Sequence, residues 1–240
     1  MQKRRTPFKK STAMFMLFLA SMFYVAQSVP SGTDIVEPVK SVGRFAALYE
    51  RLQLKQLGLD YKAYDLAISG FQKLKEKGEI KRDIISICDF TQSSVNKRLY
   101  IIDLSTGQLL FNTLVAHGKN TGEEFARFFS NIPSSNQSSL GFYRTAETYI
   151  GAHGLSLRLQ GEEPGFNNNA EGRGIVVHGA DYVSDNFASQ CGCSRLGRSF
   201  GCPAVPMEQH EEIINAIKGG SCLFVYYPDN NYLLGSKLLN

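Results

Sequence analysis

Apolar positions recur with helical spacing near the start of the chain and with strand-like spacing further on. The first pattern predicts a helix over 41–57, ended by Gly58, and a second helix over 61–77, ended by Gly78. From about residue 83 the pattern changes to short apolar runs typical of strands, at 84–90, 98–104, 109–116, 141–150, 155–160, 174–179 and 222–228. The sequence therefore predicts an α+β fold that is predominantly β and carries an N-terminal helical pair.

Two irregular stretches interrupt the strands. Residues 117–140 form a long polar loop, and residues 180–200 lead to Gly201-Cys202-Pro203. Loops of such length in a compact domain are often functional. A helix over 207–218 is expected between the second stretch and the last strand.

The first 28 residues have the pattern of a secretory signal peptide. Residues 1–12 are basic, Ala13–Ala26 is apolar, and small residues precede a cleavage position after Ser28. An apolar run of 14 residues is short for a membrane span, which needs about 20. We predict an exported protein of the periplasm or cell wall, in contact with a membrane only if the leader stays uncleaved.

The resulting organisation has four parts. They are a signal peptide (1–28), a linker (29–40), a helical segment (41–80) and a catalytic-sized domain (81–240). The leader carries five of the 26 basic residues, so the remainder has 21 basic against 22 acidic side chains. Residues 29–240 therefore lack the excess of positive charge that nucleic-acid-binding proteins carry.

Five cysteines are an odd number, so at least one thiol is free or pairs between chains. Export permits disulfides, but the spacing leaves the pairing of Cys88, Cys191, Cys193 and Cys222 open.

Cys202 is the candidate nucleophile and His178 its candidate base. His178 and Gly179 end an apolar strand, and Cys202 follows 24 residues after His178. A thiol needs a base to become a thiolate at neutral pH, and imidazole can take its proton and later return it. The amides of Gly201 and Cys202 are candidate oxyanion donors. The alternative is an inert cysteine and a structural histidine.

The surrounding motifs resemble those of the YkuD-type murein L,D-transpeptidases over roughly residues 41–240. The similar segments are 114–119, 139–143, 177–182, 195–199 and 201–204. The resemblance implies a mixed β-sheet sandwich or barrel, Cys202 and His178 as catalytic residues, and Ser199, Gly201 and Gly179 as supporting residues. It also implies peptidoglycan stem peptides as donor and acceptor, linked between diaminopimelate residues through a cysteinyl thioester, with no metal and no organic cofactor.

Two positions depart from the pattern of many relatives. Phe200 stands where many have histidine, and Ala204 where many have arginine. We expect Arg198 or Arg195 to supply the missing cation for a substrate carboxylate. Tyr143 is a further candidate for substrate binding.

The cysteines and His178 allow other interpretations. Cys191 and Cys193, with Cys202 and His178, could form a zinc site, although their spacing is tight for one. A redox role for the pair or a disulfide fits these residues as well as mere loop composition does. Asp181 or Asp185 could orient His178, but carboxylates are common in polar loops.

The remaining histidines and several arginines have simpler interpretations. His117 and His153 are expected in turns, and His210 on a solvated helix face. Arg144, Arg158 and Arg173 could contact the acidic stem peptide, but ordinary strand-surface charge explains them equally well. The functional alternatives are a carboxypeptidase or endopeptidase of the same fold and a non-catalytic wall-binding protein.

Overall fold

A computed structural model describes residues 40–190 and 192–240, which lie in one compact unit, Pro38–Asn240. The predicted leader (1–28) and the predicted linker up to residue 39 lie outside the described residues. Within those residues, no helix has both the length and the apolar character needed to cross a bilayer. The boundary between the helical segment and the catalytic-sized domain stays a prediction.

The two N-terminal helices are present, and the first is shorter than predicted. Helix α1 spans Lys40–Arg51, because Gln53 adopts the left-handed conformation (φ 52°) and the chain continues as turns. Helix α2 spans Tyr61–Glu76. The side chain of Asp60 accepts a 2.8 Å hydrogen bond from the Lys62 amide at its start, and Gly78 (φ 77°) follows its end.

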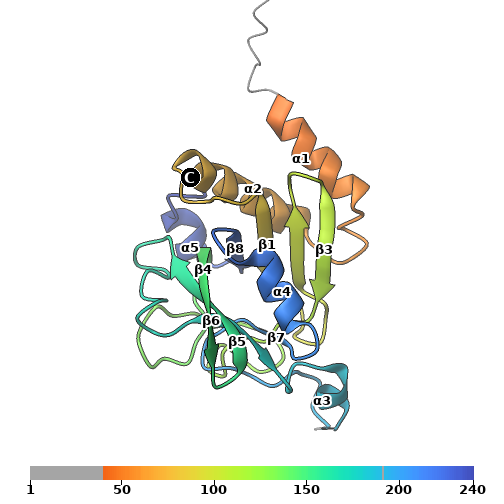
Figure 1. Cartoon of the computed structure of the whole chain (residues 1–240), viewed down its shortest axis with the longest axis vertical. Helices are drawn as coiled ribbons and strands as arrows, with labels where there is room; N and C mark the ends of the chain where they lie inside the picture. The colour runs from red at the N-terminus through yellow and green to blue at the C-terminus, as the bar shows by residue number, and fades with distance from the viewer. Residues whose placement is uncertain (1–39, 191) are drawn as a thin grey trace, which may run out of the picture. The chain divides into compact units, whose positions relative to one another are not determined.

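The eight strands form one mixed sheet in the order β3-β2-β1-β8-β4-β5-β6-β7 (Figure 1). Their bounds are β1 Ile84–Asp89, β2 Leu99–Asp103, β3 Gln108–Thr113, β4 Gly141–Gly151, β5 Gly154–Gly161, β6 Val176–Ala180, β7 Ala204–Pro206 and β8 Cys222–Tyr226. The β1–β8 and β6–β7 pairs are parallel, and the other neighbours are antiparallel. The predicted fold class is therefore confirmed.

The sheet is nearly closed into a barrel. Ala116, just after β3 at one end of the strand order, pairs with Ala204 of β7 at the other end, and its amide donates a 2.9 Å hydrogen bond to the Ala204 carbonyl. Gly118 forms a second bridge, with parallel geometry, to Ser199. The polar loop after β3 is thus joined to the segment that carries Cys202.

Helices cover the sheet and complete the core. Helix α2 packs against β1 and β8, while α4 (His210–Ile217) packs against β5, β6 and β1 (Figure 1). All six residues of β1 are buried, as expected for a strand covered on both faces. Gly70 allows α2 to approach β4, since a Cβ there would lie 2.0 Å from the ring of Phe142.

Three short elements were not predicted from the sequence. They are β7, α3 (Asp185–Gln190) and α5 (Asn230–Gly235). Each has six residues or fewer, which is too short for a periodic pattern to emerge.

Candidate functional site

Cys202 is the accessible free thiol in the described part of the chain. Cys88 and Cys222 are also free, but both are fully buried in the sheet. Cys193 is disulfide-bonded, and Cys191 lies outside the described residues. Among those residues, no group of three or more His, Cys, Asp or Glu side chains has a geometry that could hold a metal ion.

Ser199 fixes the turn that carries Cys202. Its hydroxyl donates to the Cys202 carbonyl (2.6 Å) and accepts from the Gly201 amide (3.1 Å). The Ser138 hydroxyl donates to the Gly201 carbonyl (3.1 Å). Gly201 has φ 123°, and a Cβ there would lie 2.8 Å from the Gln137 carbonyl oxygen, so this position requires glycine.

These contacts distinguish the two candidate oxyanion donors, the amides of Gly201 and Cys202. The Gly201 amide is already engaged by Ser199. The Cys202 amide makes no hydrogen bond within residues 40–190 and 192–240. The Cys202 amide is therefore the donor that this turn leaves available.

His178 lies on β6 and is buried. Its neighbours across the sheet are Ser156 in β5 and Ala204 in β7. The Nδ1 atom lies 2.8 Å from the Gly179 carbonyl oxygen. Because a carbonyl only accepts, Nδ1 carries the proton and the neutral ring presents Nε2 as an acceptor. Gly179, and not Asp181 or Asp185, orients the imidazole.

The Cys202 sulfur lies against the chain segment that leads into β6. The thiol is 3.7 Å from the Gly174 carbonyl oxygen, to which it donates. Burial raises the pKa of the Cys202 thiol, and the Val176 amide and the Arg173 guanidinium partly offset this effect. A protonated thiol therefore prevails at neutral pH.

The pKa of His178 is shifted in the opposite direction to that of Cys202. Burial lowers its pKa, and the neighbouring imidazoles of His153 and His210 lower it further, against the raising effect of the Gly179 carbonyl. Within the described residues, no hydrogen bond joins Cys202 to His178. Such bonds are often long or misaligned before substrate binds. The resting pair is thus a neutral thiol close in the fold to a neutral base.

Arg173, for which the sequence allowed either contact with a stem peptide or an ordinary surface charge, lies beside the nucleophile turn. Its guanidinium donates to the Ser130 carbonyl (2.8 Å), the Ser139 hydroxyl (2.5 Å), the Ser135 hydroxyl (3.2 Å) and the Gln137 carbonyl (2.6 Å). A Cβ on Gly201 would lie 3.3 Å from its Nη2 atom. Its one sequence signal is its place just before the strand that carries His178.

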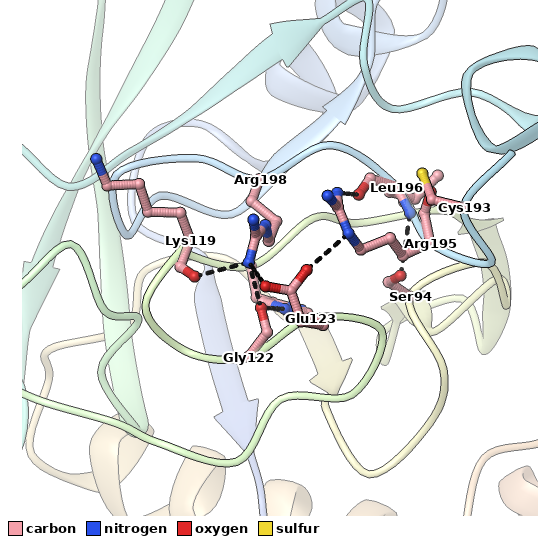
Figure 2. Close-up of polar contacts among 9 residues, drawn as sticks. Ser94, Lys119, Gly122, Glu123, Cys193, Arg195, Leu196 and Arg198 are labelled. Atoms are coloured by element: carbon pink, nitrogen blue, oxygen red, sulfur yellow. Dashed lines mark hydrogen bonds and ion pairs between the residues drawn. The ribbon is translucent and has the colours of Figure 1, made fainter. Parts of the chain in front are cut away.

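Arg195 and Arg198 are both held by Glu123 (Figure 2). Arg198 Nη1 lies 2.6 Å and Arg195 Nε lies 2.9 Å from the two carboxylate oxygens of Glu123. Arg198 also donates to the carbonyls of Lys119 (3.0 Å) and Gly122 (3.1 Å). Both arginines are therefore already paired, whereas the side chain of Glu123 is 71% exposed.

The other predicted substrate-binding residue lies in the core. Tyr143 is 1% exposed, and its hydroxyl donates to the Ser139 carbonyl (2.9 Å). Tyr143 and Gly201 line the same small internal cavity, and Tyr143 does not face solvent. Phe200, in contrast, is 70% exposed, and Lys119 Nζ lies 4.6 Å from its ring centroid.

The assignment of His117 to a turn was wrong, because it belongs to a buried network. Arg98 Nη2 donates to His117 Nδ1 (2.8 Å), and both side chains are fully buried. The His117 carbonyl accepts a 3.0 Å hydrogen bond from the Ser199 amide. Burial, and secondarily the Arg98 charge, lowers the pKa of His117 to about 4. The network anchors the backbone on which Ser199 depends.

His153 lies in a turn, as predicted, between β4 and β5, whereas His210 was misplaced by the sequence. His153 stacks on His178, with ring centroids 4.4 Å apart and planes inclined by 23°. His210 is half-buried against Gly179 instead of pointing to solvent, and its Nδ1 donates to the Met207 carbonyl (2.6 Å). No periodic pattern could show either contact, because each joins elements distant in sequence.

Comparison with known proteins gives one family match. The sequence pattern of the L,D-transpeptidase catalytic domain matches residues 55–226, which contain every candidate residue above. No curated protein matches the chain.

Several solved structures resemble the fold at low identity. An L,D-transpeptidase from Mycobacterium smegmatis shares 11% identity, with a TM-score of 0.38, over 61% of this chain and 59% of its own. The helical cell shape determining protein Pgp2 of Campylobacter jejuni shares 13% identity, with a TM-score of 0.39, over 68% and 57%. The chain thus spans about three fifths of the length of these structures.

Proposed function

Because the chain belongs to the L,D-transpeptidase catalytic domain family, we propose that it crosslinks peptidoglycan stem peptides through a thioester on Cys202. The observation that carries this proposal is the position of Cys202. Among the described residues it is the half-buried free thiol, whereas Cys88 and Cys222 are fully buried, and it lies on a turn fixed by Ser199 and adjacent to the strand that bears His178.

The first half of the reaction forms the thioester. The thiol leaves the Gly174 carbonyl and transfers its proton to Nε2 of His178, and the sulfur attacks the carbonyl of diaminopimelate in a tetrapeptide stem. The Cys202 amide donates to the oxyanion of the tetrahedral intermediate. The carbon–nitrogen bond then breaks, and D-alanine leaves with the proton from His178.

The second half transfers the acyl group. The side-chain amine of a second stem attacks the thioester carbonyl and gives a proton to His178. The carbon–sulfur bond breaks, and the sulfur recovers its proton from the imidazolium. The products are a crosslink between two diaminopimelate residues and a regenerated thiol. Water in place of the amine gives a carboxypeptidase.

Arg195 and Arg198 are the candidate cations for a stem-peptide carboxylate. The Glu123 carboxylate engages both in this structure, at an exposed position from which it can turn away. A substrate carboxylate would take the same place between the two guanidinium groups, since arginine binds carboxylates through directed N–H donors. We further propose that the protein acts after export, in the periplasm or cell wall, where its substrate lies.

The test uses purified protein and tetrapeptide muropeptides, with products identified by liquid chromatography and mass spectrometry. Crosslinked dimers that form with the wild type and disappear with Cys202→Ala would establish transpeptidation. Tripeptide without dimer would identify a carboxypeptidase. Binding of muropeptides without any product that depends on Cys202 would identify a non-catalytic wall-binding protein and refute the proposal.

A further inference from the structure

Two imidazoles flank the candidate base from different elements. The hairpin between β4 and β5 places His153 over His178, with ring centroids 4.4 Å apart and an interplanar angle of 23°. His178 is 4% exposed, whereas His153 is exposed. One face of the buried ring is thus covered by a histidine at the surface.

His210 approaches from helix α4. A Cβ on Gly179 would lie 2.7 Å from Cγ of His210, so this ring can lie against β6 only because residue 179 is glycine. The hydrogen bond from His210 Nδ1 to the Met207 carbonyl (2.6 Å) fixes the ring there. A Cβ on Gly154, the residue after His153, would lie 3.7 Å from His210 Nε2.

Both groups that act electrostatically on His178 are histidines. The residues paired with His178 across the sheet, Ser156 of β5 and Ala204 of β7, carry no charge. His153 from the hairpin and His210 from α4 are the titratable groups that oppose its protonation. Like charges on adjacent imidazoles disfavour each other.

We propose that His153 is a positioning residue for His178, holding its imidazole by stacking and setting a second ionisable ring against it. This inference rests on the proposed function, in which a neutral His178 accepts the thiol proton. The stack and the Gly179 hydrogen bond together fix the ring with Nε2 as the acceptor. His210, on helix α4, is the second imidazole that opposes protonation of His178.

The test separates stacking from charge and does not require enzyme activity. The chain has four histidines, so their ring signals can be followed individually by NMR during a pH titration. His153→Phe keeps a stacking ring and removes the charge, whereas His153→Ala removes both. Ile150→Ala is the matched control, because Ile150 is an exposed residue of the same hairpin.

We expect His153→Phe to raise the midpoint of the His178 titration by about half a pH unit, a threefold change in proton affinity. His153→Ala should raise it further, because the covering ring is lost, and should also lower kcat/KM at its plateau. With stem peptides, the acid limb of kcat/KM should move to higher pH by the same amount in His153→Phe. Ile150→Ala should change none of these.

An unchanged His178 midpoint in both His153 variants would overturn the inference. A shifted midpoint in a protein that forms no product from muropeptides would refute the proposed function and leave the imidazole contact established. The two failures are therefore distinguishable.

Discussion

The hydroxyl of Ser199 donates a 2.6 Å hydrogen bond to the carbonyl of Cys202, so the residue three positions before the candidate nucleophile closes its turn. The same oxygen accepts from the Gly201 amide. The orientation of the Cys202 amide and thiol thus depends on one side chain.

Ser199→Ala should lower kcat/KM for muropeptides about tenfold, mainly through kcat. Two hydrogen bonds of ~1 kcal/mol each are lost, and a tenfold change corresponds to about 1.4 kcal/mol. Ser199→Thr retains the hydroxyl and should recover most of the activity. Equal activity of the alanine and threonine variants would show that the turn does not need the hydroxyl.

Alkylation of Cys202 should be slow at pH 7 and accelerate only at a pH above the range in which an ordinary thiol ionises. Burial raises the thiol pKa, so the reactive thiolate is scarce at neutral pH. Mass spectrometry after iodoacetamide treatment would follow the rate. Among the free thiols of the described residues, Cys202→Ala should leave no labelling, because Cys88 and Cys222 are buried. Fast labelling already at pH 6 would contradict the assigned protonation state.

Arg173→Ala should destabilise the protein by about 2–4 kcal/mol, since four hydrogen bonds to the 130–139 loop are lost. It should also slow alkylation of Cys202, because the cation that favours the thiolate is gone. Urea unfolding and alkylation rates would measure the two effects.

Two variants sharpen that test. Arg173→Lys keeps the positive charge but cannot make the four guanidinium hydrogen bonds. The variant should therefore retain most of the Cys202 alkylation rate while losing part of the unfolding free energy. Arg158→Ala removes an exposed arginine from β5 and should change neither. An Arg173→Ala protein with wild-type stability would show that the loop does not depend on this guanidinium.

The His117 network predicts a loss of stability in acid. The pKa of His117 is about 4 in the folded protein and near 6.5 in the unfolded chain. Between these two values the unfolded chain binds a proton at this residue and the folded protein does not, so protonation favours unfolding. The contribution is present above pH 6.5 and falls by about 3 kcal/mol as the pH drops to 4.

His117→Gln supplies the comparison for this effect. Glutamine can accept from Arg98 but does not titrate, so the unfolding free energy of this variant should fall less between pH 6.5 and 4 than that of the wild type. Parallel pH dependences in the two proteins would contradict the assignment.

Glu123→Gln tests the role of the paired arginines. Loss of two ion pairs with an exposed carboxylate should cost less than about 1 kcal/mol in stability. If Arg195 and Arg198 bind a stem-peptide carboxylate, removal of the competing charge should lower KM, and Arg198→Ala should raise it. An unchanged KM in both variants would exclude these arginines from substrate binding.

The sequence by itself determined the order of the elements and singled out Cys202 and His178 as the candidate nucleophile and base. Helix α2 and seven of the strands follow from periodicity, since local pattern and burial agree along each run. Glycine at 201 and serine at 199 also carried information, because the turn depends on one residue's backbone freedom and the other's hydroxyl.

Tertiary structure alone decided which distant side chains meet. The Ala116–Ala204 closure, the stack of His153 on His178 and the position of Arg173 beside Gly201 join segments separated by many residues. Such contacts depend on sheet order and register, which a local pattern of polar and apolar positions does not specify. For the same reason His117 and His210 looked like surface residues in the sequence, and only the packed barrel shows them buried or half-buried beside the site.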